Sequence, residues 1–411
     1  MEAGNRTVRK MKVLLSAYAC EPYKGSEPDV GFQTLLTVAA HHEVWLATRE
    51  NNVETLERYL DDNPTVHPVH LVGFDLSRIK RPFKRLGLPG LIWYYDRWQK
   101  AIEPFLAKLD SDVGFDVVYH VTFAAYWMRA GASVLDKPFV WGPVGGGVDP
   151  PLRLVPELGL RGMLEDAVRV PFRRLMAALP AIRRAQLQAT VVLVNNPQTG
   201  EKIARHSQAR IEVLPNPTAV RVLENLEPRY PKLEIAYVAR LIPWKAAHLA
   251  IRAMRYLANR DAKLVVYGGG SENGRLRRAI KRWRLQQRVE LVGKLPRAEV
   301  LTRLADSAAL IHPAIHEEGG NAVAEGLAMN VPTVCLAHGG PATTVTLFPK
   351  VASRAVSPAG PTKTAQRLAA ALDEMLEHAG TERPGGFHRA ELDYQERVLA
   401  ALEEAAAAGR H

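Results

Sequence analysis

Short apolar runs alternate with longer stretches of helical spacing along most of the chain, and this rhythm restricts the fold more than any other feature. The alternation is typical of parallel β-sheets that helices cover on both faces. In the first half it predicts strands at 11–17, 43–47, 69–72, 116–121, 139–141, 190–194 and 211–214. In the second half it predicts strands at 234–238, 263–267, 289–292, 309–312 and 333–336. Each half is therefore expected to be a doubly wound α/β domain.

A proline-rich connection separates the two halves, with prolines at 215, 217, 228 and 231. Prolines at this density break both helices and strands, so the segment suits a domain boundary. We predict an N-terminal Rossmann-like domain over 1–217 and a second over 218–385, each long enough for its own core. An alanine-rich helical tail over 386–411 follows, and packing of this tail on the first domain is compatible with its composition.

The composition is that of a soluble globular protein, with 47% hydrophobic and 24% charged residues. The two cysteines, Cys20 and Cys335, lie far apart and form neither a disulfide framework nor a metal cluster, so a cytoplasmic location is expected. The apolar run near the N-terminus is interpreted as a first strand rather than as a signal peptide. No stretch approaches the roughly 18 apolar residues that a membrane-spanning helix needs.

The chain is basic, with a formal net charge of +11. Such a surface suits nucleic acid, an anionic membrane or an anionic substrate, and the absence of a nucleic-acid-binding motif argues against the first. The stretches 78–100 and 161–188 interleave cations with aromatic or aliphatic residues. This pattern fits peripheral contact with anionic lipid at the inner face of a membrane, core helices with solvated arginines, or the walls of an acceptor groove.

Residues 316–330, HEEGGNAVAEGLAMN, place Glu317 and Glu325 on either side of a small turn. The turn follows the strand predicted at 309–312, at the sheet edge where open α/β sheets bind ligands. Gly319 and Gly320 let the backbone approach a ligand, and Asn321 is predicted to be the N-cap of a helix with free N–H groups for phosphate. A zinc-protease HExxH motif is excluded, because glycine stands where its second histidine is required.

In this context the E-x7-E pattern, followed by NVPTVCLAHGGP at 330–341, resembles the retaining glycosyltransferases of family GT4. The resemblance extends from Met11 to about Ala370. It implies a GT-B fold, with two Rossmann-like domains and a central cleft. It also implies transfer of a sugar from a nucleotide diphosphate sugar, with UDP- and GDP-sugars as the expected donors, to a hydroxyl acceptor without a metal or other cofactor. In the family, the counterpart of Glu317 holds the sugar and that of Glu325 binds the ribose.

A second match is YVARLIPWKAAHLAI at 237–251, in which Arg240 and Lys245 correspond to the cations that reach the donor diphosphate. A guanidinium and an ammonium at one strand edge neutralise a diphosphate leaving group, although two solvated surface charges would give the same spacing. The family usually has glycine where Ala239 and Ala246 stand. The glycine-rich run at 264–280 also resembles the family's glycine-rich edge. The resemblance implies that Gly268 and Gly269 close over the nucleotide.

In the first half, the loop at 19–31 resembles the loop after the family's first strand. The resemblance implies that Gly25 and Ser26 approach the diphosphate and that Glu27 contacts the acceptor, whereas the alternative is an ordinary polar loop. His120 matches the histidine that faces the transferred sugar, and its alternative is a hydrogen-bonded core histidine. In WGPVGGG at 141–147, Gly145 and Gly146 would line the acceptor side.

The DxD pattern at 110–112 is interpreted as a turn and not as a metal site. Two rival functions remain for the chain as a whole. One is a non-catalytic nucleotide-sugar-binding protein, and the other is a sugar phosphorylase or epimerase on the same fold.

Overall fold

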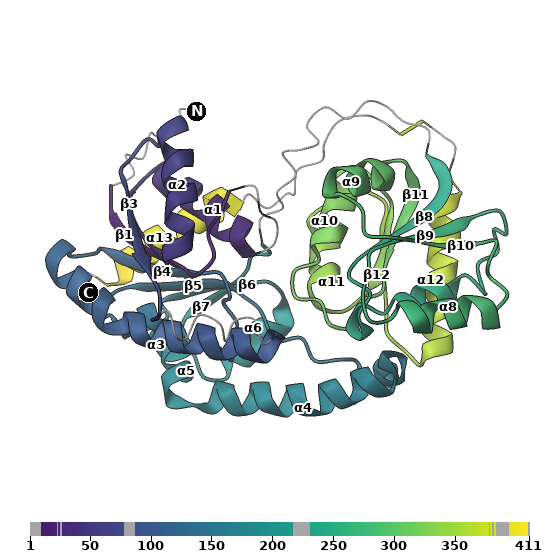
Figure 1. The fold of residues 1–411 in the computed structure, drawn as a ribbon, viewed down its shortest axis with the longest axis horizontal. Coiled ribbons are helices and arrows are strands. Elements are labelled where there is room, and N and C mark those ends of the chain that lie inside the picture. Colours follow the sequence, from purple (N-terminus) through teal and green to yellow (C-terminus); the bar gives the residue numbers. More distant parts are fainter. Residues whose placement is uncertain are drawn as a thin grey trace, which may run out of the picture. The chain divides into compact units, whose positions relative to one another are not determined.

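The structure is a computed structural model that describes residues 10–22, 24, 27–77, 87–216, 231–377, 379, 382–383 and 394–409. The chain divides into two compact units (Figure 1). The first unit comprises residues 1–147, 173–217 and 393–411, and the second comprises 148–172 and 218–392. Residues 148–172 thus pack with the second unit, although the sequence-based division had placed them in the first domain.

The first unit contains a seven-stranded parallel sheet in the order β3-β2-β1-β4-β5-β6-β7. Its strands are β1 (Lys12–Ala17), β2 (Glu43–Arg49), β3 (Val69–Phe74), β4 (Val117–Val121), β5 (Phe139–Val144), β6 (Val191–Val194) and β7 (Arg210–Val213). Its helices include α1 (Glu27–Ala39), α2 (Glu50–Asp62), α3 (Gly87–Val113), α5 (Pro180–Gln188), α6 (Pro197–Ala204) and α13 (Tyr394–Ala408). The C-terminal helix α13 packs here, and the hydroxyl groups of Tyr394 and Thr34 lie 2.9 Å apart.

The second unit contains a six-stranded parallel sheet in the order β10-β9-β8-β11-β12-β13. Its strands are β8 (Lys232–Val238), β9 (Lys263–Tyr267), β10 (Val289–Gly293), β11 (Ser307–His312), β12 (Thr333–Leu336) and β13 (Ser353–Val356). Its α-helices are α7 (Ala247–Ala253), α8 (Asn273–Arg282), α9 (Arg297–Ala305), α10 (Asn321–Ala328), α11 (Gly339–Thr346) and α12 (Pro361–Leu376). The 3-10 helix η3 (Leu152–Leu158) and most of α4 (Gly159–Ala178) also pack in this unit.

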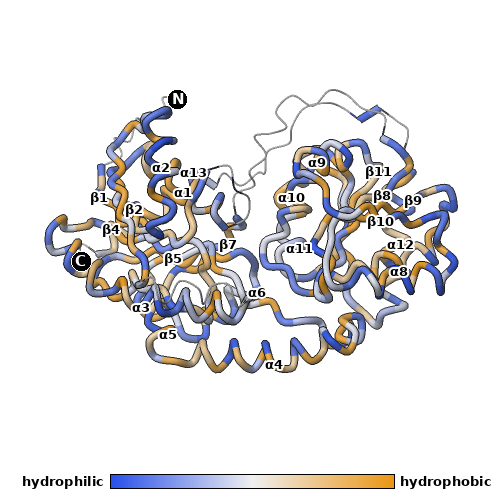
Figure 2. Tube along the Cα trace, in the orientation of Figure 1, coloured by the Kyte–Doolittle hydropathy of each residue, from blue (hydrophilic) through white to orange (hydrophobic). Residues whose placement is uncertain are grey.

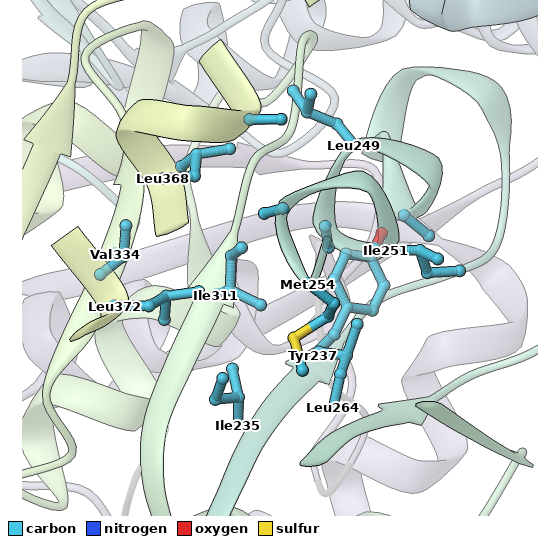
Figure 3. Close-up of a cluster of buried hydrophobic side chains, with 14 of the residues drawn as sticks. Ile235, Tyr237, Leu249, Ile251, Met254, Leu264, Ile311, Val334, Leu368 and Leu372 are labelled. Atoms are coloured by element: carbon cyan, nitrogen blue, oxygen red, sulfur yellow. The ribbon is translucent and has the colours of Figure 1, made fainter. Parts of the chain in front are cut away.

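The core of the second unit lies on both faces of its sheet, as expected for a doubly wound domain. On one face, Ile235 and Tyr237 of β8 and Ile311 of β11 pack against α7 and α12 (Figure 3). On the other face, the alternate β8 residue Ala236 and Leu310 of β11 pack with buried side chains of α9 and α10. The doubly wound architecture expected from the sequence is therefore confirmed.

Both sheets change direction beside their first strand, between β1 and β4 and between β8 and β11. Consecutive crossovers run to opposite sides at such a point, so the loops beyond the carboxyl ends of the two strands diverge and leave room for a ligand. Residues that follow β1, β4, β8 and β11 are accordingly the candidates for a functional site.

Most predicted strands lie where the sequence placed them, and those at 263–267 and 333–336 have the same bounds as β9 and β12. The edge strand β13 was missed because its sequence, SRAV, is short and half polar. The DxD residues 110–112 lie in the last turn of α3 rather than in a separate turn. There the Asp110 carboxylate accepts a hydrogen bond from the backbone N–H of Phe115, at 3.0 Å.

Candidate functional site

The loops after β8 and β11 meet at the switch point of the second unit. The first loop contains the 3-10 helix η5 (Pro243–Lys245), and the second runs from residue 313 to 320. They are joined by a hydrogen bond of 2.8 Å from the Ile315 N–H to the Trp244 carbonyl. The predicted residues Arg240, Lys245 and Glu317 therefore come from two loops at one edge of the same sheet.

A cluster of titratable side chains lies at this edge, and it consists of Lys245, Glu317 and His312. The Lys245 ammonium contacts Oε2 of Glu317, and Nε2 of His312 lies 3.3 Å from the same oxygen. Burial, and secondarily the charge of Arg240, lowers the pKa of Lys245 to about 8. Burial and the neighbouring Lys245 lower the pKa of His312 to about 3, so this imidazole is neutral. His312 was not predicted, although its position at the end of a strand was the available signal.

Arg240 lies two residues beyond β8, and its side chain is exposed. Ala246, directly after Lys245, has a left-handed backbone with φ of 52°. Glycine is usual at a left-handed position because it lacks the Cβ atom, which in other residues crowds the following carbonyl oxygen. The edge thus presents two cations, the exposed Arg240 and the partly buried Lys245, on a loop that contains a strained turn.

The turn between β11 and α10 requires glycine at its end. Gly320 has a φ of 73° and precedes the helix, so it occupies the N-cap position predicted for Asn321. Asn321 is instead the first helical residue, which corrects that prediction, because only glycine adopts this backbone without strain. The carbonyl of Gly319 accepts a hydrogen bond of 3.0 Å from the Thr344 hydroxyl. Helix α10 therefore begins at the sheet edge beside Glu317.

Gly339 and Gly340, the glycine pair of the family pattern, support the Glu317 loop from α11. The N–H of Gly340 donates to the Glu317 carbonyl at 2.9 Å. A Cβ atom on Gly340 would lie 2.2 Å from the Glu318 carbonyl oxygen, and one on Gly339 would lie 2.5 Å from that of Glu317. The glycine pair is therefore needed for the close approach of two backbone segments.

We expect Gly340→Ala to lower the free energy of unfolding by about 1–3 kcal/mol, since an added methyl group forces the backbone apart. Displacing the Glu317 loop should also lower activity. Urea denaturation measures the first effect. Gly360→Ala is the matched control, because a Cβ atom there would meet nothing within 4 Å and no positive φ is involved. Equal denaturation midpoints for the two variants would contradict the expectation.

Glu325 lies on α10 and is buried. Its Oε1 atom is 2.6 Å from Nη2 of Arg297, the first residue of α9. Burial raises the pKa of Glu325, while the Arg297 guanidinium opposes that shift. The two glutamates thus occupy different surroundings, and the Arg297 partner was not foreseen.

A second set of contacts, also not predicted, holds the Glu317 loop to residues 148–166. His316 lies 2.8 Å from the Asp166 carboxylate through Nε2 and 3.0 Å from the Val148 carbonyl through Nδ1. The Val148 N–H donates to the Glu318 carboxylate at 3.2 Å. No sequence signal links His316 to Asp166, which is 150 positions away. The segment from Val148 to α4 is therefore part of the support of this loop.

The glycines of the 264–280 run meet neighbouring backbone. Gly268 has a φ of 146°, and a Cβ atom there would lie 1.9 Å from the Ala239 carbonyl oxygen. The Gly269 carbonyl accepts a hydrogen bond of 3.1 Å from the Leu241 N–H. Close packing of the loops after β8 and β9 accounts for these glycines, and their contact with a nucleotide stays a prediction.

At the switch point of the first unit, Glu27 begins α1 and accepts a hydrogen bond of 2.6 Å from the Phe123 N–H. Burial raises the pKa of this carboxyl. Thr122 and Phe123 have φ values of 64° and 50°, so Glu27 stabilises a strained turn directly after β4. Contact of Glu27 with the acceptor stays a prediction. Gly25 and Ser26 lie outside the described residues.

His120 lies on β4 and is fully buried. Its Nδ1 atom is 3.1 Å from the Ser16 hydroxyl, and its Nε2 atom is 3.2 Å from the Tyr95 hydroxyl. Burial lowers its pKa to about 3, so the ring is neutral. These surroundings match the alternative of a hydrogen-bonded core histidine. Contact of its ring with a sugar stays a prediction.

Gly145 and Gly146 pack against the segment that follows β4. The Gly145 N–H donates to the Ala124 carbonyl at 2.8 Å. Gly146 has a φ of 85°, and its carbonyl accepts a hydrogen bond of 2.9 Å from Arg173. These contacts explain the glycines by packing, and lining of an acceptor site stays a prediction. Among the described residues, no group of three His, Cys, Asp or Glu side chains is placed to hold a metal ion.

Comparison with known proteins agrees with this geometry, since residues 224–384 match the family described as "Glycosyl transferases group 1". This part of the chain is a glycosyltransferase group 1 domain. The Escherichia coli protein named "Putative colanic acid biosynthesis glycosyltransferase WcaL" is 33% identical over 116 residues. That alignment covers 26% of this chain and 29% of WcaL, so less than a third of the relative is spanned.

Two solved structures show the same fold over nearly the whole chain. Sucrose-phosphate synthase from Thermosynechococcus elongatus has a TM-score of 0.54 at 16% identity, covering 98% of both chains. HepE of Anabaena, solved in complex with UDP, has a TM-score of 0.51 at 14% identity, covering 97% of this chain and 94% of HepE. The fold is therefore GT-B, with two Rossmann-like units, as the family resemblance implied.

Proposed function

We propose that the protein is a retaining glycosyltransferase of family GT4, which transfers a sugar from a nucleotide diphosphate sugar to a hydroxyl acceptor. One observation carries the proposal. In a glycosyltransferase group 1 domain, two cations that follow β8 and a glutamate that follows β11 come together at the switch point. A cationic sheet edge next to a carboxylate suits a ligand that has both a diphosphate and a sugar.

In this proposal, Arg240 and Lys245 stabilise the negative charge that grows on the diphosphate as the glycosidic bond breaks. The first N–H groups of α10 add to this stabilisation, since the start of a helix carries partial positive charge. Glu317 holds the hydroxyl groups of the sugar, and Lys245 is released from it when the diphosphate arrives. Glu325 accepts hydrogen bonds from the ribose hydroxyls, as an ionised carboxylate can.

Retention follows from a front-face reaction, in which the leaving phosphate helps to deprotonate the attacking hydroxyl group. The chain's own residues then need to position the donor and neutralise its charge, so no metal or other cofactor is proposed. UDP-sugars are the first donors to test because HepE was solved with UDP, and GDP-sugars are the second. The acceptor is proposed to be the hydroxyl group of a glycan, a glycolipid or a natural product.

The location proposed is the cytoplasm, with peripheral contact at the inner face of the membrane. Within the part of the chain that the structure describes, no helix is both long and apolar enough to cross a bilayer. Residues 78–86 of the first basic stretch lie outside the described residues.

A thermal-shift panel of UDP-, GDP-, ADP- and dTDP-sugars tests donor binding. A ligand that binds only the folded state stabilises it by about 2.7 kcal/mol at a concentration of 100 times its Kd, so the correct donor should raise the Tm clearly. Hydrolysis of the same donor, measured as released nucleoside diphosphate, then tests the reaction. Binding without hydrolysis or transfer would support the non-catalytic sugar-nucleotide binder instead. No shift with any of the four donors would contradict the proposal.

A further inference from the structure

Helix α4 turns an apolar face to the solvent. Leu160, Leu164, Val168 and Leu175 are 72%, 61%, 72% and 66% exposed, and Phe172 is 41% exposed. Their spacing of three or four residues places them on one side of the helix. Figure 2 shows the hydrophobic positions recurring along α4. We call these five side chains the outer face of α4.

The opposite side of α4 packs against the loops that follow β8 and β11, which we call the donor loops. Asp166 binds His316 there, Arg169 lies over the Trp244 ring at 4.7 Å, and Gly162 packs closely against Pro243. Trp244 and His316 belong to the two loops that carry Lys245 and Glu317. The outer face therefore has no role in holding those loops, and exposed apolar patches of this kind are typical of interaction surfaces.

The charged side chains of α4 have a net positive charge. Apart from Arg161 and Arg174, the exposed side chains of α4 are apolar. The two acidic residues of the helix do not add an exposed negative charge, because Glu165 is half-buried and paired with Arg161, and Asp166 is buried. A second copy of the chain would bring the same cations together, whereas an anionic bilayer offers both headgroup phosphates and an apolar interior.

A basic helix begins beside α4. Arg275 of α8 donates to the Glu157 carbonyl of η3 at 2.7 Å, just before α4 starts. Helix α8 also exposes four further cations, namely Arg277, Arg278, Lys281 and Arg282. These charges add to the attraction of this part of the second unit for an anionic surface.

We propose that the outer face of α4 binds peripherally to an anionic lipid bilayer. This deepens the peripheral contact proposed above, and it does not depend on the identity of the donor. The leucines and Phe172 insert at the boundary of headgroups and acyl chains, while Arg174 contacts phosphates. Because the inner side of α4 packs on the loops of Trp244 and His316, docking brings the donor loops near the membrane surface. An acceptor that is itself a lipid would be met there.

Arg173 and Arg174 are neighbouring cations of the basic stretch 161–188, and the sequence alone does not distinguish them. Arg173 is buried and donates to the Gly146 carbonyl, so replacing it would disturb the fold rather than test a surface. Arg174 is exposed and remains suitable. A variant at position 174 alone is therefore the correct charge test.

Flotation of the full chain with phosphatidylcholine vesicles tests the proposal. One set of vesicles contains no anionic lipid, and the other contains about 30 mol% phosphatidylglycerol. We expect binding to the anionic vesicles at low salt that weakens as salt rises. Leu164→Gln with Val168→Gln should weaken binding at least about tenfold, and Arg174→Glu should weaken it about fivefold, as expected when apolar and cationic contacts both contribute.

Two controls match these changes. Val66→Gln removes an apolar side chain that is 76% exposed outside α4, and Lys350→Glu reverses an exposed charge on the second unit. Both should leave flotation unchanged.

Failure of the wild-type protein to float with anionic vesicles at low salt would overturn the proposal. Self-association in sedimentation that the α4 double variant abolishes, without vesicle binding by the wild type, would show a contact between copies instead. Donor hydrolysis by the α4 variants, measured without lipid, should stay normal and reports separately on the proposed function.

Discussion

Lys245→Ala is expected to lower turnover by about 100-fold or more while the protein stays folded, because a cation that faces the growing charge of the leaving diphosphate is lost. Lys245 is partly buried beside Glu317, and Arg240 lies close enough to depress its pKa. Its ammonium is thus held where a diphosphate would replace Glu317 as the counter-ion. Steady-state kinetics with the identified donor measure the effect.

The matched control is Lys263→Ala, which removes an exposed lysine from the first residue of β9, at the opposite edge of the same sheet. This variant should retain normal turnover. Thermal melting of both variants separates loss of activity from loss of fold. If Lys245→Ala keeps near-normal turnover with an intact fold, the assignment of the diphosphate site is wrong.

The pH dependence of kcat/KM provides a second test of the role of Lys245. Its pKa is lowered to about 8, so the ammonium is present below that pH and is lost as the pH rises through it. Because kcat/KM reports on the free enzyme, we expect it to fall above about pH 8. Lys245→Arg keeps a positive charge at every accessible pH, so this alkaline decrease should disappear even if the rate is lower. An unchanged alkaline limb in Lys245→Arg would assign the titration to another group.

The two glutamates are expected to have separable roles. Glu325→Ala should weaken binding of the free nucleoside diphosphate about tenfold or more, because hydrogen bonds to a charged acceptor are lost. Glu317→Ala should bind the same nucleotide within about threefold of wild type but turn over about 100-fold more slowly, since it acts on the reacting sugar. Calorimetry measures the first quantity and single-turnover kinetics the second.

Arg297→Ala separates the ribose role of Glu325 from its ion pair. Arg297 has a half-exposed side chain, so its guanidinium can be hydrated when Glu325 is removed. If the ion pair alone were responsible, Arg297→Ala would weaken nucleotide binding as much as Glu325→Ala does. If Glu317→Ala loses nucleotide affinity and Glu325→Ala does not, the two roles are reversed.

Much of the candidate site was predictable from local sequence. Glu317 was assigned to the ligand-binding edge of a sheet because its loop follows a predicted strand, and Arg240 and Lys245 were assigned to the site by the resemblance to GT4. The resemblance to GT4 then supplied their expected roles. The Gly339–Gly340 pair was also recognised, but only the structure shows that it is needed for contact with the Glu317 and Glu318 carbonyls.

The sequence by itself determined the two doubly wound units and which residues stand at the ends of β8 and β11, since periodicity and spacing along the chain encode both. Only the tertiary structure decided burial and pairing. It placed His120 in a core, joined His316 to Asp166 across 150 positions, and turned Arg173 inward while exposing the apolar side of α4. These outcomes depend on which surfaces pack together, and a residue's neighbours in sequence do not specify its neighbours in space.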